Sequence, residues 1–120
     1  SSMDFLTSEV FSLMSIDPAP TAYISLGTRM LAGTLEGLRD NGWRIPEDVS
    51  VVAVGDTDRS RLYAPALSTV TWDLNSVGEN LAELLLRRLS ASSQAEPRRI
   101  IIPTKLIDRQ SCARPSQVAN

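Results

Sequence analysis

Apolar residues recur along this chain with two kinds of spacing, and the spacing predicts its helices and strands. Over residues 4–14 they stand at roughly helical spacing, which predicts a short amphipathic helix. Pro18 and Pro20 resist helix formation, so the helix must end before the apolar run TAYISL at 21–26. That run is continuous rather than alternating, as in a strand buried on both faces of a parallel sheet. The run VSVVAV at 49–54 has the same character and predicts a second strand.

A second helical pattern links these two strands. It begins at Gly27-Thr28, and Gly42 is placed to end it as a C-terminal cap. Strand, helix and strand with short links form a βαβ unit, whose crossover is almost always right-handed. The polar loop 55–65 then leads to a third predicted strand, LSTVTW at 67–72. The fold class that follows is α/β with a parallel sheet.

The last helical pattern covers residues 74–89. Asp73, Asn75 and Ser76 compete for its N-cap, and a glutamate at 79 supplies part of a capping box. Apolar side chains recur there at intervals of three and four residues. This spacing predicts one buried stripe, made of Val77, Leu81, Leu84, Leu85 and Leu89.

The C-terminal part of the chain predicts one more strand and a loose end. Residues 99–107 are typical of a strand, which Pro103 restricts to an edge or a bulge. The chain is polar from Arg109 on and is expected to fray. The predicted organisation is a cloning remnant at 1–3, one domain over 4–111 and a flexible tail at 112–120.

Composition and charge narrow the function. With 120 residues, 42% of them hydrophobic and 22% charged, the chain has room for one soluble globular domain. Its formal net charge of −2 gives no global basic field for nucleic acid. The pairs Arg87–Arg88 and Arg98–Arg99 are interpreted as a solvated helix face and a strand edge. We therefore expect the chain not to bind DNA by itself.

Catalytic and metal chemistry find little support in the sequence. The chain has no histidine, so its single cysteine, Cys112, lacks the base that a cysteine nucleophile needs, and no Ser/His/Asp set exists. Asp56 and Asp58 form a D-x-D pair that could hold a divalent cation, although such a pair in a loop is usually turn chemistry. No phosphate loop or dinucleotide-type glycine spacing is present. We expect neither an enzyme nor a cofactor or metal site.

The single cysteine also bears on the compartment. It forms no internal disulfide, which suits a reducing cytoplasm, and neither a signal peptide nor a membrane-spanning run is visible. The sequence thus predicts a cytoplasmic protein without membrane contact.

A binding site is best sought at the carboxyl ends of the predicted strands, where ligands gather in open α/β sheets. Those ends are Gly27 and Thr28, Gly55 and Asp56, and Trp72. Asp56 could accept hydrogen bonds from a ligand hydroxyl, Thr28 could donate one, and Trp72 could pack against a ring. Alternatively, Asp56 only orders its turn, Thr28 only caps its helix, and Trp72 belongs to the core.

Several short motifs follow one another without gaps between residues 20 and 111. They are Pro20-Thr21-Ala22, Met30, Gly33, Gly42, the run PEDVSVV at 46–52, Asp56, Pro65, the run LSTV at 67–70 and a final RRIIIPTKLIDRQS. This order resembles the C-terminal half of lactose/galactose-repressor (LacI/GalR) family transcriptional regulators. In that family a PTA strand, a helix, a PEDVSVV strand, a loop and an LTTV strand precede a leucine-rich helix and a strand that ends in R-x-S.

The resemblance implies a three-layer αβα parallel sheet, as in a lobe of a type I periplasmic-binding-protein-like domain, present here in part. Such regulators, usually repressors, bind a small effector between two lobes. They bind operator DNA through an N-terminal helix-turn-helix domain, which this chain lacks. The chain would then be an effector-binding and dimerisation module. By the same resemblance, residues to about 72 belong to the second lobe, and those after it would normally complete the first.

The partners implied by the family are a sugar or other small metabolite and a second copy of the chain. Operator DNA would be reached only through the absent domain. The family dimerises through the helix after the PTA strand and the loop after its Asp-Asp pair. The matching residues here are Leu31, Leu35, Leu38, Leu62, Tyr63 and Ala64. Leucines of that helix must also cover the sheet, so Leu62-Tyr63 in a charged loop is the better interface signal.

The sequence departs from the family at positions that matter for the effector. The Asn-Asp pair after the PTA strand is Gly27-Thr28 here, and the first residue of the Asp-Asp pair is Gly55. Two polar anchors that commonly hold a sugar hydroxyl are thereby replaced, so a sugar effector does not follow from the resemblance. Trp72 stands where the family often places a polar contact residue and is the pocket position that we favour.

Two other functions share this architecture. A solute-binding protein of a transport system is the alternative, but the PEDVSVV and LSTV segments and the lack of an export signal favour a regulator. A nucleotide-handling α/β enzyme would need a phosphate loop or a carboxylate–histidine pair, which the sequence lacks.

Overall fold

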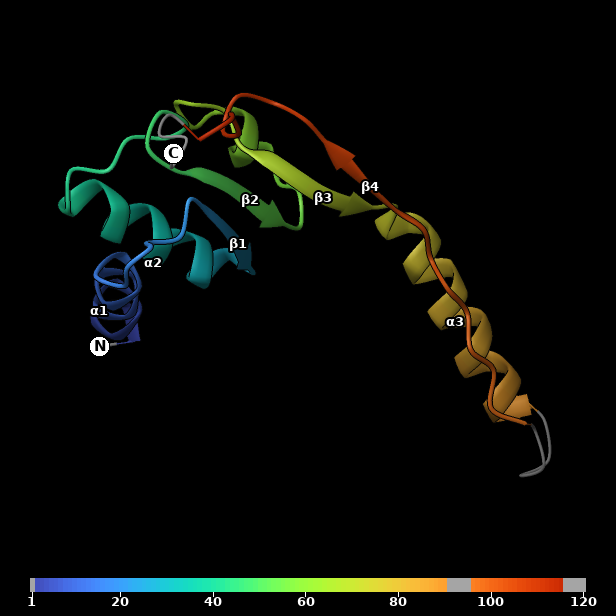
Figure 1. Ribbon diagram of the computed structural model, residues 1–120. Coiled ribbons are helices and arrows are strands. Elements are labelled where there is room, and N and C mark those ends of the chain that lie inside the picture. The colour runs from blue at the N-terminus through green and yellow to red at the C-terminus, as the bar shows by residue number, and fades with distance from the viewer. Residues whose placement is uncertain (1, 91–95, 116–120) are drawn as a thin grey trace. The chain divides into compact units, whose positions relative to one another are not determined.

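The computed structural model of the chain describes residues 2–90 and 96–115. Ser1, in the predicted cloning remnant, and residues 116–120, in the predicted tail, lie outside this range. The elements, in chain order, are α1 (Ser2–Met14), β1 (Ala22–Leu26), α2 (Thr28–Asp40), β2 (Ser50–Val54), the 3-10 helix η1 (Asp58–Arg61), β3 (Ser68–Trp72), α3 (Leu74–Ser90) and β4 (Thr104–Ile107) (Figure 1). They divide into two compact units: the first holds Ser1–Thr71 and Leu106–Asn120, the second Trp72–Lys105.

The strands form one sheet in the order β1-β2-β3-β4. β1 pairs with β2 in parallel, with Ile24 opposite Val52, and β2 pairs with β3 in parallel, with Ala53 opposite Thr69. The predicted βαβ unit is therefore confirmed. β4 begins directly after Pro103 and is the last strand in the order, as expected for a segment whose proline has no N–H to donate.

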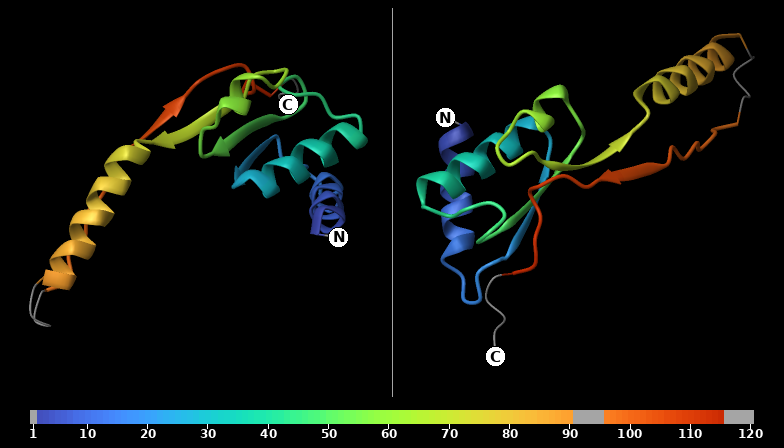
Figure 2. Two further views of the ribbon diagram at one scale, coloured as in Figure 1. Left: turned by 180° about the vertical axis from the view of Figure 1, so that it is seen from behind. Right: turned by 90° about the horizontal axis from the view of Figure 1, so that it is seen from above.

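The core of the first unit lies between α2 and the inner side chains of β1 and β2. It consists of Val10, Tyr23, Leu31, Leu38, Val49, Val51, Ala53 and Leu67. α1 lies against α2 at two glycines (Figure 2). A Cβ on Gly33 would stand 2.5 Å from the Cβ of Leu6, and one on Gly37 would stand 2.9 Å from the Cβ of Val10. The helices approach this closely only because both positions lack a side chain.

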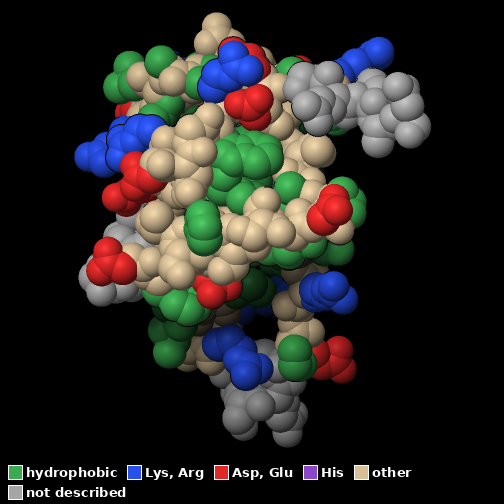
Figure 3. All heavy atoms as spheres, turned by 60° about the vertical axis from the view of Figure 1, so that its left-hand side comes forward, with side chains coloured by type: hydrophobic (Ala, Val, Ile, Leu, Met, Phe, Trp, Pro, Cys, Tyr) green, Lys and Arg blue, Asp and Glu red, His purple; other side chains and the backbone are tan. Residues whose placement is uncertain are grey.

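Helices cover one face of the sheet in the first unit. On the opposite face Ile24 and Leu26 are 71% and 66% exposed, and Val52 and Val54 are half-buried. The predicted α/β class with a parallel sheet is confirmed. Apolar side chains also gather on the outer surface of the molecule, between acidic and basic ones (Figure 3).

The second unit contains α3, whose N-cap is Asp73. The Asp73 Oδ1 accepts hydrogen bonds from the backbone N–H groups of Asn75 at 3.0 Å and Ser76 at 3.3 Å. The prediction of a buried stripe on α3 is wrong for this structure. No residue of the helix is buried, and Leu81, Leu85 and Leu89 are 61%, 59% and 74% exposed. Periodicity shows which face of a helix is apolar, but burial also requires a second apolar surface.

The chain does not fray at Arg109, contrary to expectation. The backbone N–H of Val51 donates to the Ser111 carbonyl at 2.9 Å, and that of Gln110 donates to the Ala66 carbonyl at 3.0 Å. The Ser111 hydroxyl donates to the Val51 carbonyl, and the Ser111 residue is fully buried. A polar segment is thus fixed to the strands because its hydroxyls and backbone satisfy buried polar groups.

Among residues 2–90 and 96–115, no helix combines the length and the apolarity that crossing a bilayer requires.

Candidate functional site

The carboxyl ends of β1 and β2 lie next to each other, because Leu26 is opposite Val54 in the parallel register. Gly27 and Gly55 directly follow these residues, so the structure brings two predicted site positions together. Both have a positive φ, of 85° and 99°, which disfavours any other residue. Nothing lies within 4 Å of where a Cβ on either glycine would stand. Both positions therefore face open space.

Thr28 is the first residue of α2 and is exposed. The N-cap position belongs to Gly27, and no side chain caps this helix. Thr28 therefore does not have the capping role that was its alternative interpretation.

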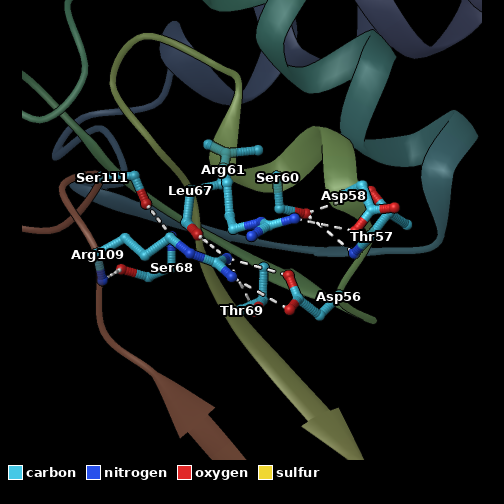
Figure 4. A network of polar contacts seen from close by, with 10 residues as sticks. All are labelled: Asp56, Thr57, Asp58, Ser60, Arg61, Leu67, Ser68, Thr69, Arg109 and Ser111. Atoms are coloured by element: carbon cyan, nitrogen blue, oxygen red, sulfur yellow. Dashed lines mark hydrogen bonds and ion pairs between the residues drawn. The ribbon is translucent and has the colours of Figure 1, made fainter. Parts of the chain in front are cut away.

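Asp56 is held by Arg109, which lies 53 residues further along the chain (Figure 4). The Arg109 Nη1 donates to the Asp56 Oδ1 at 3.0 Å, and its Nη2 donates to Oδ2 at 3.1 Å. The same Nη1 donates to the Leu67 carbonyl at 2.7 Å and to the Thr69 hydroxyl at 3.4 Å. The Arg109 side chain is only 13% exposed and the Asp56 side chain only 24%. A bidentate, largely buried pair of this kind fixes the start of the 55–67 loop.

Two opposing effects act on the pKa of Asp56 in this ion pair. Hydrogen bonding from Arg109 lowers the pKa of Asp56, and this effect outweighs burial, which raises it. Asp56 is therefore ionised near neutral pH, and each of its oxygens already accepts a hydrogen bond. The geometry supports the interpretation that Asp56 orders its turn.

Sequence analysis missed Arg109, since it assigned that residue to a fraying end. The R-x-S ending of the matched motif was the available signal, because Arg109 and Ser111 are its two polar positions.

The second aspartate of the D-x-D pair does not complete a metal site. Asp58 opens η1, and its carboxylate pairs with Arg61 at 3.1 Å. Within the part of the chain that the structure describes, no group of three His, Cys, Asp or Glu residues could hold a metal ion.

Trp72 is the last residue of β3 and is half-buried. It belongs to the second unit, whereas the other four predicted site residues belong to the first.

A groove of about 900 Å³ lies on the first unit, between α2 with its following loop and the loop after η1. Three predicted interface residues, Leu35, Tyr63 and Ala64, line it. Leu62 and Tyr63 are 81% and 41% exposed. The remaining apolar lining, which sequence analysis did not anticipate, is Ala32, Trp43, Ile45, Pro65 and Leu67. The apolar centre and charged surroundings give the groove the composition of a protein contact surface.

Leu31 and Leu38 are not part of this surface. They are 8% and 0% exposed and belong to the core of the unit. Their assignment to the interface is wrong, because the leucine face of α2 that they form covers the sheet.

Comparison with known proteins gives a consistent picture. Residues 2–112 match the family of periplasmic binding protein-like domains. The lactose operon repressor of Rhizobium radiobacter is 30% identical over 105 residues, covering 88% of this chain and 91% of that protein. The HTH-type transcriptional repressor PurR of Escherichia coli O1:K1 / APEC is 33% identical over 101 residues, covering 84% of this chain and 29% of that protein.

A solved structure of another protein has a fold similar to that of this chain. A LacI family transcriptional regulator from Enterococcus faecium with bound ribose superposes with a TM-score of 0.74 at 25% identity, covering 92% of this chain and 40% of that chain. The chain thus spans only part of the length of PurR and of the ribose-bound regulator, and these relatives are transcriptional regulators rather than enzymes. From its match over residues 2–112 and its kinship with the lactose operon repressor, the chain belongs to the LacI family of transcriptional regulators, as part of their periplasmic-binding-protein-like effector-binding domain.

Proposed function

We propose that this chain is the effector-binding and dimerisation module of a bacterial transcriptional repressor whose DNA-binding domain lies outside it. The observation that carries the proposal is the juxtaposition of Gly27 and Gly55 at the carboxyl edge of β1 and β2, with open space before both. That edge is where open α/β sheets bind ligands. Such a repressor works in the cytoplasm and responds to a small metabolite.

The effector meets this edge mainly through backbone groups and the Thr28 hydroxyl. Two glycines allow a ligand to approach the backbone closely. Asp56 contributes to the shape of the edge, because Arg109 already engages both of its oxygens. An edge with so few side-chain acceptors suits an effector less polar than a sugar. Trp72 is kept as the ring contact that the sequence predicts.

The test of this site is the substitution Trp72→Ala in the full-length protein. An effector is first identified by thermal-shift screening of metabolites, with ribose as the polar reference. Loss of ring packing is expected to weaken effector affinity about tenfold in a calorimetric titration. The control Phe11→Ala removes an exposed ring of α1 and should leave effector affinity unchanged. Unchanged affinity in Trp72→Ala would remove Trp72 from the site.

The groove beside Tyr63 is the proposed dimer surface, covered by a second copy. Leu62 and Tyr63 are exposed apolar side chains inside a charged loop, and Trp43, Ile45 and Leu35 continue the apolar surface beside Tyr63. Burying them between two copies supplies the hydrophobic stabilisation that a stable dimer needs.

Sedimentation equilibrium over a range of concentrations tests the dimer. Tyr63→Asp should weaken self-association at least about tenfold, since it places an unpaired charge in a desolvated contact. Tyr63→Phe keeps the ring and should keep the dimer. A strict monomer at every concentration would count against the interface and favour the solute-binding alternative.

A further inference from the structure

Two arginine pairs that are eleven positions apart in the sequence stand at and after the end of α3. Arg87 and Arg88 stand in its last turn, and Arg98 and Arg99 follow on the segment that runs back toward β4 (Figure 2). Arg87, Arg88 and Arg98 line a single cleft of about 200 Å³, together with Leu84, Glu96 and Pro97. Sequence analysis treated the pairs as separate solvated surfaces, whereas the structure places Arg87, Arg88 and Arg98 in the lining of one cleft.

The charge around this cleft is strongly one-sided. The cleft is lined by three arginines and one glutamate, although the whole chain has a net charge of −2. All four arginines of the two pairs are exposed. The cluster therefore presents a net positive charge to solvent.

The helix dipole explains only half of this cluster. Cations in the last turn of a helix interact favourably with its C-terminal end, which accounts for Arg87 and Arg88. Arg98 and Arg99 lie beyond the helix, so the dipole gives no reason for their position. Of these two, Arg98 lines the cleft, and its presence there indicates a ligand of opposite charge.

The residue type narrows the chemistry of that ligand. The guanidinium group presents a planar fork of donors that matches the oxygens of a phosphate, and each group binds two oxygens at once. The half-buried Leu84 provides an apolar floor along which the arginine stems can lie. The cleft thus offers several guanidinium groups around a space that suits a single phosphate group.

We propose that Arg87, Arg88 and Arg98 form a surface that binds the phosphate backbone of duplex DNA. This inference rests on the proposed function, since a DNA-bound repressor holds a duplex near its effector-binding module. The contact adds affinity that does not depend on base sequence and falls as salt rises. It supplements the base recognition of the separate DNA-binding domain and revises the expectation that this chain makes no DNA contact of its own.

The experiment titrates the isotope-labelled chain with a short duplex of arbitrary sequence, followed by amide NMR at about 25 mM salt, where phosphate contacts are weakly screened. Shifts are expected at residues 84–88 and 96–99. In Arg87→Glu/Arg98→Glu the affinity should fall at least about tenfold, and the slope of log affinity against log salt should fall by about two. The matched control Arg39→Glu/Arg61→Glu has the same net charge, at two exposed arginines of the first unit. Its affinity should change less than about twofold, because these arginines lie outside the cluster.

Three outcomes would overturn the proposal: no shifts at low salt, an equal loss of affinity in the control variant, or equally tight binding to phosphatidylserine vesicles. The amide spectrum of the unit that carries the substitutions reports whether each variant remains folded. Failure here leaves the effector and dimer tests untouched. Failure of those tests with DNA binding intact would instead refute the proposed effector site and dimer surface and keep the phosphate surface.

Discussion

The two longest helices that follow strands, α2 and α3, carry similar leucine patterns and have opposite burial. In α2, Leu31 and Leu38 are buried between the sheet and α1. In α3 no residue is buried, although its leucines recur at the same spacing. The leucine spacing therefore indicates that this helix face requires an apolar partner surface. It does not indicate whether such a surface is present. Most helical stability in proteins comes from packing of such a face, so the first unit should be the more stable of the two.

The largest expected difference comes from one leucine in each helix. Leu38→Ala removes a side chain that is 0% exposed and should lower the free energy of unfolding by about 2–5 kcal/mol, because a cavity is left in the core. Leu89→Ala, at a residue that is 74% exposed, should change it by less than about 0.5 kcal/mol. Urea unfolding followed by tryptophan fluorescence measures both. Equal effects would mean that a partner surface covers α3 in solution.

The next largest effect is expected for the ion pair between Asp56 and Arg109, which both belong to the first unit. Arg109→Gln should lower the free energy of unfolding by about 1.5–3 kcal/mol at neutral pH, because Asp56 loses a charged donor pair. Arg44→Gln, which breaks the solvent-screened pair with Asp48, is the control and should have a much smaller effect on the free energy of unfolding. Urea unfolding at neutral pH compares the two variants.

The stabilisation by this ion pair should depend on pH, and the pKa of Asp56 fixes the direction of that dependence. Arg109 holds the pKa of Asp56 below its ordinary value, so the stabilisation is present above the unfolded pKa of about 3.9. It is lost as pH falls through the lower pKa of the folded state. The difference between the wild type and Arg109→Gln should therefore shrink in acid below pH ~4. A difference that stays constant into strong acid would mean that the pair is not formed.

Local signals made most of the fold predictable from the sequence. Pro103 predicted an edge strand, although the strand was expected over residues 99–107 and β4 covers only Thr104–Ile107. Gly42 follows the end of α2 with the positive φ of a cap. The pair of Asp56 and Arg109 could not be predicted in this way, because it joins positions 53 residues apart that only the completed sheet brings together. Periodicity likewise identified Leu38 as apolar but not whether the sheet or a second copy would cover it.

The smallest effects come from two helical glycines, and they should have opposite signs. Gly78 of α3 has nothing within 4 Å of a built Cβ, so Gly78→Ala should stabilise the helix by about 0.5–1 kcal/mol through propensity alone. Gly33 of α2 gains the same propensity, but its new Cβ would stand 2.5 Å from the Cβ of Leu6. Overpacking of this kind costs about 1–3 kcal/mol, so Gly33→Ala should be destabilising overall. Thermal unfolding followed by circular dichroism compares the two variants. Stabilisation by both would mean that α1 does not lie against α2 in solution, which would remove the feature that distinguishes the two helices.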